Sequence, residues 1–127
     1  MSAYTIKNIL ESDDDAAKNG MGDVLEAHFP REALGCRQTG VSLQRLKPDQ
    51  KLPFAHTHKN DEEIYVVLSG SGTAVVDGDT HELKPMDALR VAPDTVRSFS
   101  SGPDGLEMLA FGTHHDDDAV PPPDSTT

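Results

Sequence analysis

Short apolar runs separated by turn residues are the feature that most constrains the fold of this chain. Five such runs occupy residues 41–46, 64–68, 73–76, 88–92 and 106–111. Each run has the length of a strand and is shorter than an ordinary helix. Glycine or proline occurs in each of the gaps between them. Many short strands at regular spacing predict an all-β sandwich or small barrel.

The strongest local signal is a hairpin over residues 75–80, which read Val-Val-Asp-Gly-Asp-Thr. An Asp-Gly pair readily adopts the positive φ angles of a type I′ turn, which joins two antiparallel strands. We expect further turns at residues 69–72 and 102–105, where glycines cluster between apolar runs.

The length of 127 residues suits one domain with a real core. We expect an N-terminal extension over residues 1–39 that packs on the barrel or on a dimer partner, a barrel over residues 40–113, and a disordered, acidic and Pro-rich tail over residues 114–127. Within the extension, residues 4–10 are a candidate strand. Residues 24–29 are another, which pairs along the sheet or with another subunit. Single helical turns are expected at residues 15–19 or 30–34.

His56 and His58 are two positions apart, so on a strand both imidazoles lie on one face. A polar turn at residues 59–61 then allows the chain to fold back and bring the carboxylate of Glu63 to them. Two neutral imidazoles and one carboxylate are the ligands of a non-haem iron site, and they also suit catalytic zinc. Manganese, nickel and copper are alternatives, and an ordinary solvated loop end is the interpretation without a metal.

The stretch from His56 to Gly70 resembles the first conserved motif of the cupin superfamily. That motif reads His, any residue, His, three or four residues, Glu, six residues, Gly. Glu63 fits both spacings, whereas Glu62 fits only the first. The resemblance therefore implies a double-stranded β-helix, or jelly-roll barrel, with His56, His58 and Glu63 as metal ligands.

The second cupin motif is less complete, within a resemblance that runs from Gly40 to Gly112. Arg97 stands where the family places its third metal-binding His, and a guanidinium cannot ligate a cation. At about 4 Å, two unit charges repel by roughly 4 kcal/mol at an effective dielectric of 20. Three arrangements are open. Arg97 points away from the site, pairs with Glu63 in a metal-free cavity, or lies at the pocket mouth and binds an anionic ligand.

Three aromatic residues, Phe54, Tyr65 and Phe99, are candidates for an apolar wall around the site and its substrate. Strand alternation places Phe54 on the side of the two histidines and Tyr65 on the side of Glu63. Val67 shares that second side. Packing in the core is the alternative role for each aromatic ring.

The charge and the cysteine content limit the binding partners and the cellular compartment that the sequence predicts. The chain has 22 acidic and 11 basic residues, a formal net charge of -11, which opposes binding to nucleic acid and to anionic membranes. Cys36 is the only cysteine, which excludes an intramolecular disulfide and fits a reducing cytoplasm. No segment is apolar and long enough to span a bilayer.

The resemblance implies a homodimer with an interior site for a divalent metal ion (Fe, Mn, Zn or Ni) and for a small molecule that can be anionic. It does not fix a reaction, because one fold supports many functions. A metal-dependent oxygenase, or an isomerase or epimerase, is one hypothesis. A metal-free binding or sensing module without catalysis is the alternative, and a purely structural dimerisation barrel is a third.

Overall fold

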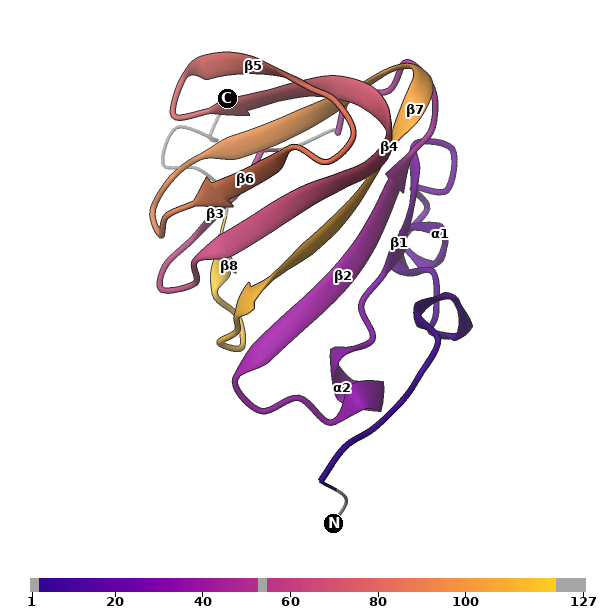
Figure 1. The fold of residues 1–127 in the computed structure, drawn as a ribbon, viewed down its shortest axis with the longest axis vertical. Coiled ribbons are helices and arrows are strands. Elements are labelled where there is room, and N and C mark those ends of the chain that lie inside the picture. The colour runs from indigo at the N-terminus through magenta and orange to yellow at the C-terminus, as the bar shows by residue number, and fades with distance from the viewer. Residues whose placement is uncertain (1–2, 53–54, 121–127) are drawn as a thin grey trace.

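A computed structural model describes residues 3–52 and 55–120. Strands dominate it, and the short helices lie beside β1 and β2 (Figure 1). The elements in chain order are η1 (Ile9–Glu11), α1 (Asp15–Lys18), β1 (Leu25–His28), α2 (Arg31–Leu34), β2 (Thr39–Leu46), β3 (Thr57–His58), β4 (Glu63–Val76), β5 (Asp79–Leu83), β6 (Ala88–Val91), β7 (Arg97–Thr113) and β8 (Ala119–Val120). The all-β prediction is confirmed. Among the helices of these residues, none has the length and hydropathy to cross a membrane.

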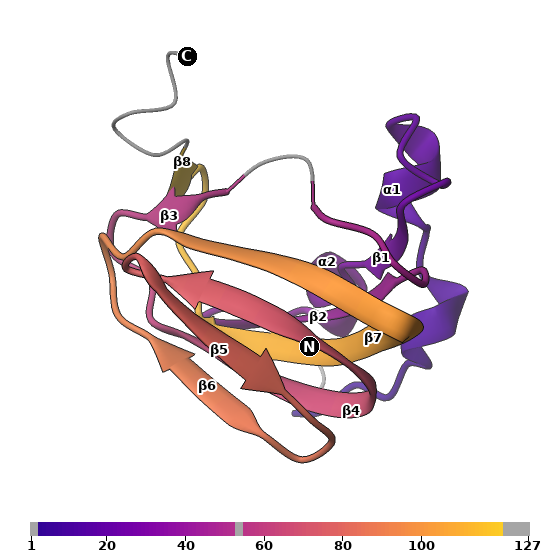
Figure 2. The ribbon, with the colours of Figure 1, turned by 90° about the horizontal axis from the view of Figure 1, so that it is seen from above.

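Two long strands, β4 and β7, organise the fold. They pair antiparallel from Glu63 opposite Gly112 to Val76 opposite Arg97. The large sheet has the order β1-β2-β7-β4-β5, with β6 also paired to β4, and β3 and β8 form a small separate sheet. Both long strands bend, so the sheet curves back on itself (Figure 2).

The bends replace two of the turns that the sequence predicts. Residues 69–72 and 102–105 do not end a strand, because the chain continues through them within β4 and β7. Around Gly70 the register between the two strands shifts, which is the mark of a β-bulge. Gly70 has φ +79°, and a Cβ atom there would overlap the carbonyl oxygen of Gly105. This close backbone approach requires glycine.

The remaining local predictions have mixed outcomes. The hairpin is confirmed, since Val76 pairs with Asp79 across a turn in which Asp77 and Gly78 both have positive φ. Both helical turns form, as α1 and α2. The candidate strand at residues 4–10 is wrong, because residues 4–8 have no regular secondary structure and Ile9 and Leu10 belong to η1. The second candidate strand becomes β1, which pairs with β2 of the same chain.

The hydrophobic core lies between the two halves of the bent sheet. From residue 106 to residue 110 of β7, every second residue is buried to 2% exposure or less, namely Leu106, Met108 and Ala110. The side chains packed with them include Leu25, Leu46, Tyr65, Val67, Ala74, Val91 and Phe99. Burying one large apolar side chain contributes about 1.5–3 kcal/mol, so these contacts hold β4 and β7 in a fixed register.

Residues 114–120 differ from the disordered tail that the sequence predicts. They include β8, which pairs with β3, and the buried side chain of Asp118. That carboxylate accepts hydrogen bonds from the backbone N–H groups of Asn60 and Asp61. A segment poor in apolar residues is therefore ordered here by polar contacts. Residues 121–127 lie outside the described part, and the predicted domain boundaries stay a prediction.

Candidate metal centre

Three donor side chains meet where β3 and β4 begin. His56 lies just before β3 and forms an isolated bridge with Arg97, His58 ends β3, and Glu63 opens β4. The ligand atoms of the two histidines and Glu63 all lie within 4.8 Å of one another. The Nε2 atoms of His58 and His56 lie 3.1 and 3.9 Å from Glu63 Oε1. Ligands about 2.0–2.2 Å from a metal lie roughly 3–3.5 Å apart, so the His58 distance matches that spacing and the His56 distance is longer.

Glu63 is the electrostatic centre of this group. Its Oε1 accepts a hydrogen bond from the Tyr65 hydroxyl at 2.7 Å. Burial alone would raise the pKa of Glu63, but contacts with His56, His58 and Tyr65 outweigh burial and hold that pKa well below its usual range. Glu63 is therefore an anionic carboxylate at neutral pH, as a metal ligand must be. In return, the contact with Glu63 raises the pKa of His58.

Arg97 forms an ion pair with Glu63, the contact that the second of the three arrangements requires, while the presence or absence of a metal stays a prediction. Its Nη2 donates to Glu63 Oε1 at 3.2 Å and its Nη1 donates to the carbonyl of Thr95 at 3.1 Å. The side chain is fully buried, so it neither points away nor lies at a pocket mouth. Its Nε finds no hydrogen-bond partner among the residues described. Among the described residues, these hydrogen bonds and ion pairs of Glu63 all use Oε1.

Two of the three aromatic candidates, Tyr65 and Phe99, lie in the core. Tyr65 and Phe99 are each 2% exposed, and their ring centroids are 4.7 Å apart. Tyr65 and Val67 share the buried side of β4, in the predicted alternation. Burial raises the pKa of the Tyr65 phenol, so the hydroxyl stays protonated and donates to Glu63. Phe54 lies outside the described residues.

The sequence analysis missed two acidic residues beside His58. The Nδ1 atom of His58 lies 3.4 Å from Asp118 Oδ2 and 3.8 Å from Asp61 Oδ2. These three residues form a second group with ligand atoms within 4.8 Å of one another. Asp118 belongs to the predicted tail, and no local pattern connects it with residue 58. The one available signal is the turn at residues 59–61, whose backbone N–H groups need an acceptor.

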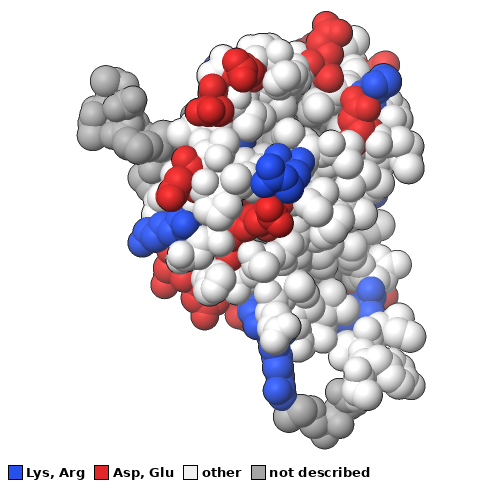
Figure 3. All heavy atoms as spheres, turned by 60° about the vertical axis from the view of Figure 1, so that its left-hand side comes forward, with Lys and Arg blue, Asp and Glu red and all other residues white. Residues whose placement is uncertain are grey.

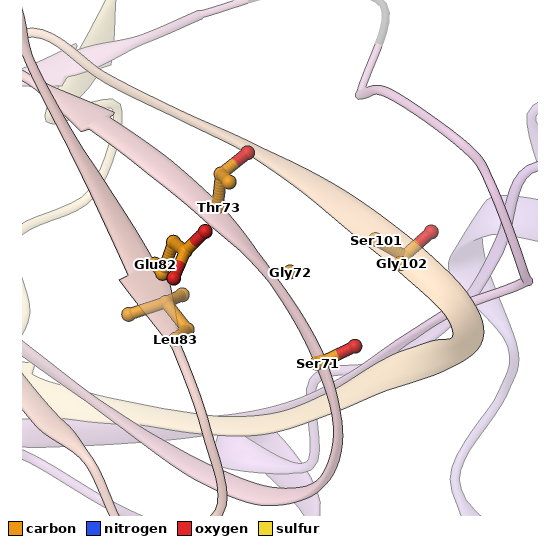
Figure 4. A pocket seen from close by; sticks show the side chains of 7 residues that line it. All are labelled: Ser71, Gly72, Thr73, Glu82, Leu83, Ser101 and Gly102. Carbon is orange, nitrogen blue, oxygen red and sulfur yellow. The ribbon is translucent and has the colours of Figure 1, made fainter.

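A separate pocket of about 310 Å³ lies at the bend of the long strands (Figure 4). Its lining consists of Ser71, Gly72, Thr73, Glu82, Leu83, Ser101 and Gly102. The donor group at the start of β4 contributes nothing to this lining. The pocket is therefore distinct from the interior site that the sequence predicts.

Comparison with known proteins places these observations in a family. A family model, described as a cupin domain, matches residues 42–111. A cupin protein from Bacteroides fragilis superposes with a TM-score of 0.71 at 28% identity, covering 92% of this chain and 89% of that one. A sugar phosphate isomerase from a cupin superfamily, from Silicibacter pomeroyi, gives a TM-score of 0.65 at 25% identity, covering 88% of this chain and 69% of that one.

One curated relative is similar in sequence. The dimethylsulfoniopropionate lyase DddW of Ruegeria pomeroyi is 33% identical over 84 residues, 65% of this chain. The chain matches 49% of that relative, about half of its length. Together with the bent antiparallel sheet, the structural similarities confirm the predicted double-stranded β-helix.

Proposed function

The chain belongs to the cupin family, and from this premise we propose that it binds a divalent metal and uses it on a small anionic molecule. The observation that carries the proposal is the convergence of His56, His58 and Glu63. Iron, manganese, zinc and nickel are the candidate ions, because imidazole and carboxylate suit all four. When bound, such an ion would polarise an oxygen atom of the substrate.

Two residues beside the three donors form hydrogen bonds with Glu63. The Tyr65 hydroxyl and the Arg97 guanidinium both bond Oε1, so they fix the orientation of the carboxylate. Arg97 and Glu63 offset each other in charge, and the carboxylates of Asp61 and Asp118 lie at the other ring nitrogen of His58. A bound divalent ion would therefore add positive charge on the side of Glu63 and Arg97, and we propose that an anionic molecule binds there.

The outer surface gives an anion no general attraction. The formal net charge is -11. On the face shown in Figure 3, acidic side chains occur in clusters with basic ones between them. Selectivity for an anion would therefore arise inside the barrel, near the metal ligands, rather than from long-range steering by the surface.

We further propose that the chain is an enzyme. Of the three similar proteins named above, two are described as enzymes, a lyase and an isomerase. Dimethylsulfoniopropionate and sugar phosphates both carry an anionic group. A carboxylate and a phosphate are both recognised by buried cationic groups. Dimethylsulfoniopropionate and a panel of sugar phosphates are accordingly the first substrates to assay with the metal-loaded protein.

The experiment for the metal is elemental mass spectrometry of protein purified without an affinity tag. Three proteins are compared: the wild type, a His56→Ala/His58→Ala variant, and a His81→Ala/His114→Ala control that removes two histidines outside the site. We expect near-stoichiometric metal in the wild type and control, and a loss in the site variant. Equal metal content in all three proteins would contradict the proposal.

A metal-free binding module is the second candidate. The buried ion pair between Arg97 and Glu63, at 3.2 Å, favours it, because the Arg97 guanidinium already neutralises the charge of the Glu63 carboxylate. In that case the wild type would remain free of metal even after reconstitution. Carboxylates and phosphates would still raise its melting temperature, and no turnover would be observed.

The homodimer and the cytoplasmic location remain proposals. Alternation along the strands turns Val41, Ile64 and Phe111 away from the core, and Phe111 pairs with both of the others. Phe111 is 40% exposed, so a second copy would bury an apolar stripe on this face. Light scattering after size-exclusion chromatography tests the dimer. The free cysteine, Cys36, supports a reducing compartment.

A further inference from the structure

The two ring nitrogens of His58 face different carboxylates. Nε2 lies 3.1 Å from Glu63 Oε1, on the side of the proposed metal. Nδ1 lies 3.4 Å from Asp118 Oδ2, and this buried atom has no hydrogen-bond partner within the described ranges. A ring nitrogen buried beside a carboxylate is a polar atom for which the fold supplies an acceptor.

Asp118 is held in place by a set of nitrogen donors. It is 3% exposed. Asn60 donates to it from both its backbone N–H and its side-chain amide at 3.0 Å, and the Asp61 N–H donates at 2.9 Å. The Asp118 carbonyl in turn accepts from the Lys59 N–H at 3.1 Å. The carboxylate therefore cannot swing away from His58 without breaking several hydrogen bonds.

Asp61 is the other carboxylate near this nitrogen, but His115 engages both of its oxygens. The His115 ring nitrogen Nδ1 lies 2.6 Å from Asp61 Oδ1, and the His115 backbone N–H donates to Oδ2 at 3.1 Å. Asp61 is also the more distant of the two from His58, at 3.8 Å against 3.4 Å. Both carboxylates already accept hydrogen bonds from nitrogen donors, so the shorter distance is what favours Asp118 as the acceptor for His58 Nδ1.

The position of one proton decides whether His58 can bind a metal. A neutral imidazole carries a single N–H, and only the other nitrogen has a lone pair for the ion. Nε2 is close to Glu63 Oε1. Without a carboxylate at Nδ1, a neutral His58 would therefore carry its proton on Nε2 and donate it to Glu63. That tautomer blocks the metal. A carboxylate at Nδ1 draws the proton to the other side of the ring and frees the Nε2 lone pair.

We propose that Asp118 is the positioning residue that holds His58 in its metal-binding tautomer. This inference rests on the proposed function and deepens it, because it makes the segment after β7 part of the metal centre. The pairing of β8 with β3 sets His58 directly opposite Ala119, the neighbour of Asp118. The ligand and its positioning residue are thereby tied by backbone as well as side-chain contacts.

The test uses the Asp118→Asn variant, which keeps the side-chain volume but replaces one acceptor oxygen with a donor. Asp117→Asn is the matched control, since Asp117 is an exposed neighbour of the same charge. Two quantities are measured on each full-length protein. They are the tautomer of the neutral His58 ring without metal, from ¹⁵N NMR of histidine-labelled protein at a pH above the raised pKa of His58, and the Mn²⁺ dissociation constant, from electron paramagnetic resonance.

We expect the wild type and Asp117→Asn to carry the His58 proton on Nδ1. Asp118→Asn should shift it to Nε2 and weaken Mn²⁺ binding by about 10- to 100-fold, the usual effect of losing such a partner. An unchanged tautomer with an affinity within twofold of wild type would overturn the inference. A wild type with its proton on Nε2 would also overturn it, even if the variant fails to fold.

Different results would contradict the proposed function and the proposed role of Asp118. Wild-type protein that binds no Mn²⁺ contradicts the proposed function, whereas the tautomer measurement still decides the role of Asp118. Wild-type protein that binds Mn²⁺ as tightly as Asp118→Asn retains the proposed function and removes the inference.

Discussion

The guanidinium of Arg97 lies 3.2 Å from the Glu63 carboxylate in a fully buried position, where the cupin resemblance implies a third metal-binding histidine. One residue thus removes a ligand and competes for another. The Arg97→His variant should reverse both effects, because it removes the cation and offers an imidazole. We expect Mn²⁺ binding at least tenfold tighter than wild type by isothermal titration calorimetry.

The Arg97→Gln variant separates the two effects, since it removes the charge without adding a ligand. Its Mn²⁺ affinity should fall between those of the wild type and Arg97→His. Breaking a buried ion pair from one side typically costs about 3–5 kcal/mol, so Arg97→Gln should also unfold at lower urea concentration. Weaker metal binding in Arg97→His than in wild type would show that Arg97 does not oppose the ion.

Tyr65 orients Glu63 through its hydroxyl group, at 2.7 Å from Oε1. The Tyr65→Phe variant keeps the ring against Phe99 but removes this donor. A hydrogen bond to a charged group contributes about 1.5–3 kcal/mol, and we expect a loss of that size in the free energy of unfolding. Mn²⁺ affinity should fall several-fold. Tyr4→Phe is the control, because Tyr4 is 77% exposed, and it should change neither quantity.

Gly70 permits the close crossing of β4 and β7, and it is also the last residue of the cupin motif. The Gly70→Ala variant should be destabilised by strained φ and by overlap with the Gly105 carbonyl. Gly78→Ala is the control, because Gly78 has φ +83° but open space around its Cβ position. Thermal denaturation should show a clearly larger drop in melting temperature for Gly70→Ala. Equal drops would mean that backbone strain alone explains the requirement for glycine.

His28 and Glu26 give the fold a pH dependence away from the metal centre. The ring nitrogens of His28 face Glu26 Oε2 at 2.5 Å and the Ser12 carbonyl at 2.9 Å, so the doubly protonated ring satisfies both acceptors. Burial alone would lower the pKa of His28, but these contacts raise it above 6.5. The contact with His28 lowers the pKa of Glu26.

The raised pKa of His28 and the lowered pKa of Glu26 decide how the free energy of unfolding changes with pH. Stability from His28 is fully present below about pH 6.5 and is lost as pH rises through the raised pKa. Stability from Glu26 is present above the unfolded-state pKa of Glu26 and is lost as pH falls through the lowered one. The His28→Gln substitution should therefore lower the free energy of unfolding, measured with urea, by more at pH 6 than at pH 8.5. His81→Gln, at an exposed histidine, should show no such change.

The sequence predicted the parts of the site that depend on local spacing. Two histidines at alternate positions and a glutamate five residues later come together because a short strand, a polar turn and the next strand follow in order. The choice of Glu63 over Glu62 agrees with the structure, in which Glu62 is exposed and pairs with Arg90 at the surface. The hairpin at Asp77 was predictable for the same reason.

The features that the sequence did not predict depend on contacts between residues far apart in the chain. Arg97 could have faced three ways, and only the packing of β7 against β4 turns it onto Glu63. Asp118 is 60 positions from His58 and lies among aspartates that read as solvated tail. The glycines around Gly70 predicted a turn, whereas tight packing between two long strands makes them a bulge. Composition and periodicity carry no information on such pairings.

The central claim is that Glu63 is the carboxylate ligand of a metal. Mn²⁺ titrations of Glu63→Gln and Glu62→Gln test it most directly, because both changes remove one negative charge from adjacent residues. Removing a true ligand should weaken binding by at least about 100-fold, whereas Glu62→Gln should stay within a few-fold of wild type. Equal affinities in the two variants would contradict the account.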